Sequence, residues 1–157
     1  MTKRRSTEEN STNTHQYPSV RDVDLVGTYP AEASAGGGYV WDDFLEYRVW
    51  CHPECGALSN EEGDDYFFAF SSFAEASAFS KNTQGAEEPL ALILQAEYIG
   101  EDHPGEYRHV KENRITEWPV EFLLRPRRTP ETIPLFFSPQ APNNRLAILR
   151  GLDRKNT

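Results

Sequence analysis

The sequence has few of the residues that stabilise small secreted domains or cross membranes. Only two of its 157 residues are cysteines, which excludes a disulfide scaffold. Its most apolar run, Leu90–Leu94, is far shorter than the roughly 18–20 residues that a membrane-spanning helix needs. Residues 1–10 are charged and polar and contain no apolar stretch typical of a secretory signal. We therefore expect a cytoplasmic protein with reduced cysteines and no membrane segment.

The strong catalytic and metal-binding motifs are also missing. The chain has no Walker-type glycine loop, no H-x-x-x-H pair and no G-x-S-x-G elbow. Cys51, His52 and Cys55 offer two thiols and an imidazole, and His103 or His109 would complete a tetrahedral zinc shell. Their C-x3-C spacing has no second cysteine pair, however, so we interpret them as ordinary core and surface side chains. We predict neither a metal nor a cofactor.

Basic residues are scarce, and their distribution is uneven. The net charge of −9 argues against a protein that coats nucleic-acid phosphates. Residues 39–124 carry eighteen acidic and five basic side chains, whereas residues 125–157 carry two acidic and seven basic ones. Two interpretations stay open: the basic C-terminal segment lies against its own acidic domain, or it contacts an external acidic partner.

The apolar residues predict one domain. Residues 1–38 are poor in large apolar side chains and end in a glycine run, which is typical of a flexible tail and linker. Hydrophobic residues make up 38 % of the whole chain, and most of them lie in residues 39–152. This number suffices for the core of a single domain. Residues 153–157 form a polar end. We expect an N-terminal tail followed by one folded domain.

The local patterns predict an α+β fold. Alternation over 44–51 indicates a strand with Leu45, Tyr47, Val49 and Cys51 on one face and Phe44, Glu46, Arg48 and Trp50 on the other. Further strands are predicted at 66–70, 89–99 and 118–124, and short elements at 133–137 and 146–152. Ser72 and Glu75 form a capping box before a helix over 73–81. The predicted architecture is a small, mostly antiparallel sheet with one helix packed on it.

Several blocks of the chain carry a family resemblance. They are YVWDDF (39–44), VWCHP (49–53), DYF (65–67), FSKNTQGAEEPL (79–90) and HVKENRITEW (109–118). These blocks resemble a group of small uncharacterised bacterial proteins that are often labelled GNAT-type acetyltransferases. The resemblance implies an acetyl-CoA-dependent N-acetyltransferase. Such enzymes bind the pyrophosphate in a turn with Arg or Gln three residues before a glycine, and no glycine here has that neighbour.

A second pattern is similar to ADP-ribosyltransferase-like domains. Its residues, in chain order, are Arg48 or His52, Tyr66 with Ser71 and Ser72, and Glu117 or Glu121. The resemblance implies an NAD-using enzyme in which the glutamate stabilises an oxocarbenium ion and the arginine or histidine holds NAD. The alternative interpretation is a strand, a capped helix and a surface glutamate.

The aromatic residues lead to a third hypothesis, which we prefer. Strand parity places Arg48, Trp50 and Trp118 on one sheet face, with Lys111 and Arg114 nearby. Such a face suits a small anionic ligand or a peptide. We therefore predict a non-catalytic ligand- or partner-binding protein, with the two enzyme classes as alternatives. Its candidate ligand-binding residues are Arg48, Trp50, His52, Tyr66, Ser72, Glu117 and Trp118.

Overall fold

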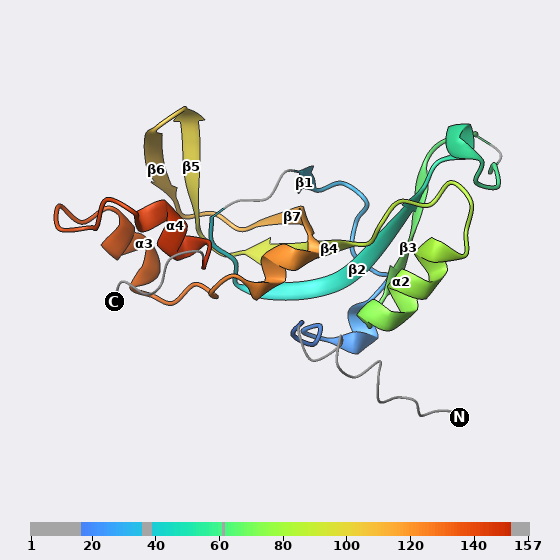
Figure 1. Ribbon diagram of the computed structural model, residues 1–157, viewed down its shortest axis with the longest axis horizontal. Coiled ribbons are helices and arrows are strands. Elements are labelled where there is room, and N and C mark those ends of the chain that lie inside the picture. The colour runs from blue at the N-terminus through green and yellow to red at the C-terminus, as the bar shows by residue number, and fades with distance from the viewer. Residues whose placement is uncertain (1–16, 36–38, 61, 152–157) are drawn as a thin grey trace.

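The computed structural model describes residues 17–35, 39–60 and 62–151 (Figure 1). The strands are β1 (Ser34–Ala35), β2 (Asp43–Cys51), β3 (Tyr66–Phe70), β4 (Leu90–Gln95), β5 (Tyr98–His103), β6 (Glu106–Val110) and β7 (Arg114–Pro119). The α-helices are α2 (Phe73–Lys81), α3 (Thr132–Phe136) and α4 (Arg145–Leu149), and the 3-10 helices are η1 (Val23–Leu25), η2 (Pro53–Cys55) and η3 (Val120–Leu124). Within these residues no helix has the length and apolarity to cross a membrane.

A five-stranded sheet forms the centre of the molecule. Its strand order is β1-β7-β4-β2-β3, and every pair is antiparallel except β1 with β7. The helix α2 packs beside β2 and β3 at one end of the sheet, and α3 and α4 lie at the other end (Figure 1). The predicted α+β fold with a small antiparallel sheet is confirmed.

The helix α2 has the predicted boundaries because its start is encoded locally. The Ser72 side chain accepts a hydrogen bond from the Glu75 amide at 3.1 Å, which satisfies one free N–H group of the first turn. Lys81 lies in the last turn, where a positive charge interacts favourably with the helix dipole. Ala76 is fully buried against the sheet.

A β-bulge changes the predicted parity of β2. The register against β4 shifts between Phe44 and Glu46, and such an extra residue reverses the faces on one side of the irregularity. Phe44 consequently lies in the same hydrophobic cluster as Tyr47, with ring centroids 4.7 Å apart. The prediction that these two side chains occupy opposite faces is wrong.

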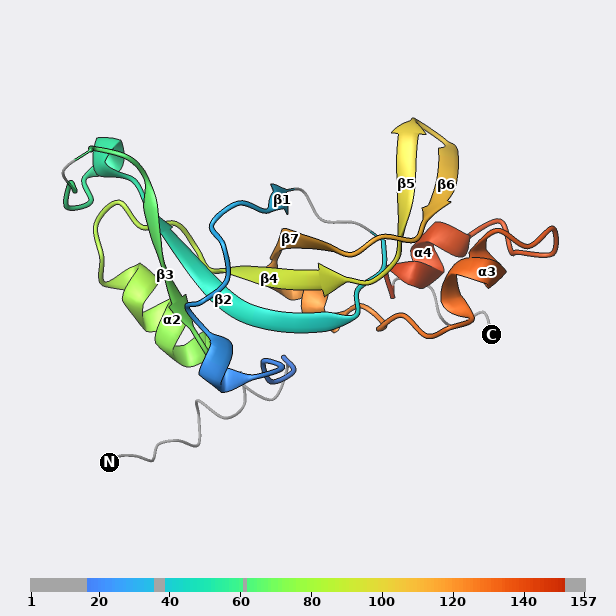
Figure 2. The same cartoon turned by 180° about the vertical axis from the view of Figure 1, so that it is seen from behind.

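The hairpin of β5 and β6 was not predicted. It projects from the sheet beside α3 and α4, as the view from behind shows (Figure 2). Gly105 adopts a φ of +84° in the connecting turn, a conformation that glycine reaches without the cost of a β-carbon. Tyr98–His103 and Glu106–Val110 therefore form a two-stranded arm.

The last strand of the sheet ends earlier than predicted. β7 covers Arg114–Pro119, and Val120–Leu124 forms a 3-10 helix instead of continuing the strand. Pro119 has no amide hydrogen to extend a strand ladder, and it stands at the N-cap of this helix. The predicted strand over 118–124 is therefore mostly wrong.

Part of the predicted flexible tail belongs to the folded domain. Residues 34–35 pair with β7, and the Arg21 amide donates to the Phe44 carbonyl at 2.8 Å. Tyr17 and Val20 pack against the main hydrophobic cluster. The domain therefore includes residues 17–35, while 1–16, 36–38 and 152–157 lie outside the described residues.

Two hydrophobic clusters hold the molecule together. The first lies between α2, η3 and one sheet face and comprises Trp41, Phe44, Tyr47, Val49, Ala76, Ala91, Ile93, Trp118, Val120 and Leu123. The second, made by Val40, Ile99, Ile133 and Phe136, lies between the hairpin and α3. It fixes the C-terminal helices to the rest of the fold.

Candidate functional site

Three of the predicted ligand-binding residues meet on one sheet face. Arg48 and Trp50 come from β2 and Glu117 from β7, and one oxygen of the Glu117 carboxylate joins them. This Oε2 accepts from Nη1 of Arg48 at 3.0 Å and from Nε1 of Trp50 at 2.9 Å. Glu46, fully buried, accepts from Nε of Arg48 at 2.7 Å. The cluster resembles a binding site in composition.

The guanidinium of Arg48 has no donor left for a ligand, however. Besides its bonds to Glu46 and Glu117, it donates to the backbone carbonyls of Tyr29, Pro30 and Ala31. These contacts account for all five N–H groups of an arginine. The side chain is fully buried. Arg48 thus connects the sheet to the N-terminal segment and has a structural role.

Trp118 lies on the other side of the sheet. The register aligns Trp118 with Ala91 of β4, and Ala91 with Tyr47 of β2. Trp118 is consequently fully buried in the first hydrophobic cluster, whereas its neighbour Glu117 faces Arg48. The predicted face shared by Arg48 and Trp118 is therefore wrong.

The two cations that we expected beside this face lie elsewhere. Arg114 donates from Nε to Oε1 of Gln95 at 2.6 Å, and its guanidinium covers the ring of Tyr98 at 3.7 Å. Lys111 is exposed in the connection between β6 and β7.

His52 forms a separate polar contact beyond the end of β2. Its Nδ1 lies 2.9 Å from the Asp65 carboxylate, and its Nε2 contacts Glu87. The hydrogen bonds to Asp65 and then to Glu87 raise the pKa of His52 because both stabilise the imidazolium. The imidazole thereby joins the segments before β3 and before β4.

Tyr66 and Ser72 also have structural contacts. The hydroxyl of Tyr66 donates to the Leu58 carbonyl at 2.6 Å, which closes the loop before β3. Ser72 caps α2, as described above. Their predicted ligand-binding role has no contact in the structure that favours it.

The cysteines do not assemble a metal site. Cys51 is buried, and burial raises the pKa of its thiol, whereas Cys55 is exposed. The part of the chain that the structure describes contains no group of three or more His, Cys, Asp or Glu side chains placed to hold a metal ion.

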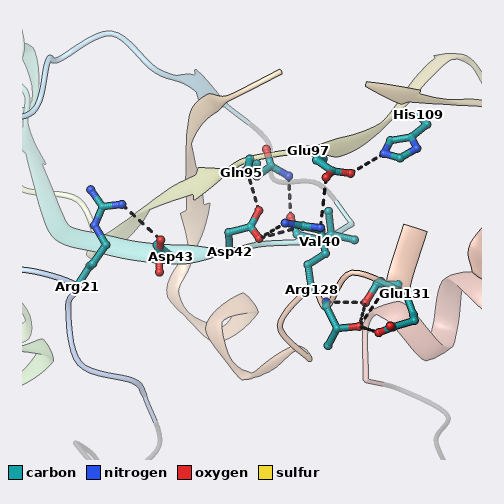
Figure 3. Close-up of polar contacts among 12 residues, drawn as sticks. Arg21, Val40, Asp42, Asp43, Gln95, Glu97, His109, Arg128 and Glu131 are labelled. Atoms are coloured by element: carbon teal, nitrogen blue, oxygen red, sulfur yellow. Dashed lines mark hydrogen bonds and ion pairs between the residues drawn. The ribbon is translucent and has the colours of Figure 1, made fainter. Parts of the chain in front are cut away.

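A second polar network joins the sheet, the hairpin and the C-terminal segment (Figure 3). Arg128 lies between two carboxylates, with Nη2 2.8 Å from Asp42 and Nη1 3.6 Å from Glu97. Glu97 also contacts Nε2 of His109 at 2.7 Å, which lowers the pKa of this carboxyl group. The basic C-terminal segment therefore contacts its own acidic domain through Arg128.

A cavity lies between α3 and α4 in the C-terminal region. Its volume is about 480 Å³, within the range of pockets that hold small organic ligands. Its apolar lining includes Leu135, Phe136, Ala141, Pro142, Ile148 and Leu149. Leu135 is 63 % exposed and Ile148 37 %, so apolar surface faces solvent there.

Arg127 and Arg145 also line this cavity. Arg145 donates from Nη1 to the Phe136 carbonyl at 2.6 Å, and its guanidinium lies 4.2 Å above the Phe136 ring. The guanidinium of Arg127 lies 4.8 Å from the ring of Trp41. No pattern in the sequence predicts this cavity, although the excess of basic residues over 125–157 marks the segment that forms it.

Comparisons of the chain with protein-family models, with curated proteins and with solved structures find no significant match. The acetyltransferase and ADP-ribosyltransferase activities implied by the sequence resemblances therefore stay predictions.

Proposed function

We propose that the protein is a non-catalytic binding protein that takes a small, largely apolar molecule into the cavity between α3 and α4. The observation that supports this function is the cavity itself, with its volume of about 480 Å³ and its mainly apolar lining. A bound ligand would cover Leu135 and Ile148, whose exposure to water is unfavourable.

The chemistry of the lining favours binding over catalysis. None of the described residues that line the cavity is a histidine, cysteine, lysine or carboxylic acid. The described lining residues supply no base that would activate the hydroxyl groups of Thr132 and Ser138 as nucleophiles. The site thus offers contact surface and hydrogen bonds but no proton-transfer group.

The test compares two leucines of similar exposure. Leu135 lines the cavity, whereas Leu124 is not part of its lining, and their exposed fractions are 63 % and 56 %. We expect 2-naphthoate, an aromatic acid used as a probe, to raise the Tm of the full chain in a saturable way. Leu135→Asp should abolish this shift, and Leu124→Asp should retain it.

Two results would contradict the proposed function. One is the absence of any saturable binding by 2-naphthoate and its neutral amide at millimolar concentration. The other is a clear shift of Tm with acetyl-CoA or NAD, which would support one of the two enzyme classes instead.

A further inference from the structure

The charged side chains that line the cavity all have one sign. Arg127 and Arg145 are its charged lining residues among those that the structure describes, and no carboxylate accompanies them there. This contrasts with Arg48 and Arg128, each of which contacts two carboxylates. The described lining residues therefore contribute positive charge beside the apolar surface and no negative charge.

Arg127 is available to bind an anion. In residues 17–35, 39–60 and 62–151 its guanidinium has the ring of Trp41 as its contact, and no hydrogen bond or ion pair. Stacking on an aromatic face leaves the N–H groups at the edge of the guanidinium plane free to donate. The side chain is exposed, so a ligand can reach it.

Arg145 is held in place but is not saturated. One N–H of Nη1 donates to the Phe136 carbonyl, and the rings of Phe136 and Tyr107 lie 4.2 and 5.7 Å from its guanidinium carbon. An arginine has five N–H groups, and the other four have no hydrogen-bond partner in the described part of the chain. A guanidinium fixed on an aromatic ring loses little further freedom when it pairs with a carboxylate.

From these contacts we infer that the cavity selects an amphipathic anion: a small organic acid whose apolar body lies against Leu135 and Ile148 and whose carboxylate pairs with Arg127 and Arg145. This inference rests on the proposed function and adds the chemical class of the ligand. A bidentate arginine–carboxylate pair is both stronger and more directional than a neutral hydrogen bond. The acid is therefore expected to bind more tightly than a neutral molecule of the same shape.

The experiment measures the affinity of the full chain for 2-naphthoate and for 2-naphthamide by calorimetry at pH 7. These probes share one apolar body and differ in the charge of the head group. We expect the affinity for the acid to exceed the affinity for the amide by about tenfold or more. Added salt should weaken binding of the acid and leave binding of the amide nearly unchanged.

Variants locate the origin of this selectivity. Arg127→Gln and Arg145→Gln should each lower the affinity for the acid by about threefold or more while the amide binds as before. Arg108→Gln is the control, because it removes a positive charge of the hairpin that pairs with Asp102 outside the cavity. If Arg145→Gln disturbs folding through its Phe136 contact, Arg127→Gln decides the outcome.

The possible results separate the two proposals. Equal affinity for acid and amide, or equal loss in Arg108→Gln and Arg127→Gln, would overturn anion selection and leave the apolar cavity as a binding site. Failure of both probes to bind would overturn the proposed function itself.

Discussion

At the scale of single residues, Arg48 determines how three parts of the chain fit together. Its guanidinium joins Glu46 of β2, Glu117 of β7 and the carbonyls of residues 29–31. A buried arginine in such a network is costly to remove, because the Glu46 carboxylate that it neutralises stays buried. The cluster therefore contributes to stability and to the position of the N-terminal segment.

The first prediction concerns this network. We expect Arg48→Met to lower the free energy of unfolding by about 3–5 kcal/mol, because Glu46 then keeps a buried charge without its cation. Urea denaturation at pH 7 measures the change. The control is Arg108→Met, which breaks an exposed pair with Asp102 and should cost less than about 1 kcal/mol. Similar losses in the two variants would refute a structural role for Arg48.

The second prediction concerns His52 and pH. Hydrogen bonds to Asp65 and Glu87 raise the pKa of His52 in the folded state, so folding favours the imidazolium. Its stabilisation is fully present below the unfolded pKa of about 6.5 and is lost as pH rises through the folded pKa. The stability difference between the natural chain and His52→Gln should therefore shrink as the pH rises above the unfolded pKa of about 6.5.

Thermal unfolding over this pH range tests the expectation. The control variant is His103→Gln, because the His103 imidazole is 75 % exposed in its pair with Glu106. A stability difference for His52→Gln that stays constant or grows with pH would show that the imidazolium is not the stabilising form.

At the scale of elements, the connection before β4 depends on a close backbone approach. Gly85 has a φ of +82°, and a β-carbon there would lie 2.3 Å from the Ala57 backbone nitrogen. We predict that Gly85→Ala lowers the free energy of unfolding by about 2–5 kcal/mol, from backbone strain and from this clash together.

Gly63→Ala is a matched control for that prediction. Gly63 also has a positive φ, +74°, but among the described residues, its chain neighbours aside, no atom lies within 4 Å of an added β-carbon. Its substitution should cost only about 1–2 kcal/mol from the backbone conformation. Urea denaturation of both variants separates the two contributions, and equal losses would mean that the approach to Ala57 carries no cost.

The elements differ in how far the sequence predicts them. Helix α2 was predicted correctly because Ser72 and the alanine-rich turns act within a few residues of one another. The bulge in β2 depends on its pairing with β4, which no pattern within β2 reveals. The hairpin packs Ile99 against Ile133, so its stability comes from a segment distant in sequence.

The candidate site, too, depends on contacts between segments distant in sequence, which local patterns do not predict. Arg48 and Glu117 both belong to the predicted ligand-binding residues, and the structure pairs their side chains at 3.0 Å. Their structural use, however, depends on the backbone of residues 29–31, which the sequence placed in a flexible tail. The cavity is formed by five-residue helices among prolines, too short to give a periodic signal.

At the scale of the whole molecule, the opposite charges of the two regions have two separate uses. Arg128 pairs with Asp42 and Glu97 and attaches the C-terminal segment to the acidic domain. Arg127 and Arg145 instead line the cavity, and none of the described lining residues is a carboxylic acid. Part of the positive charge of the C-terminal region thus forms ion pairs within the domain, and another part lies at the proposed binding site.

The extent of the folded domain leads to the last prediction. A chain that starts at residue 39 lacks the carbonyls of Tyr29, Pro30 and Ala31, three of the five acceptors around Arg48. Because bonds to a charged group are worth about 1.5–3 kcal/mol each, we expect this chain to lose at least about 3 kcal/mol or to unfold without a cooperative transition.

A double-mutant cycle assigns that loss to Arg48. Where the shortened chain still unfolds cooperatively, Arg48→Met should cost it less than it costs the full chain, because part of the network is already missing. Urea denaturation of the four proteins gives the coupling between the segment and the side chain. Strict additivity would mean that residues 17–35 stabilise the domain through β1 and the packing of Tyr17 and Val20, independently of Arg48.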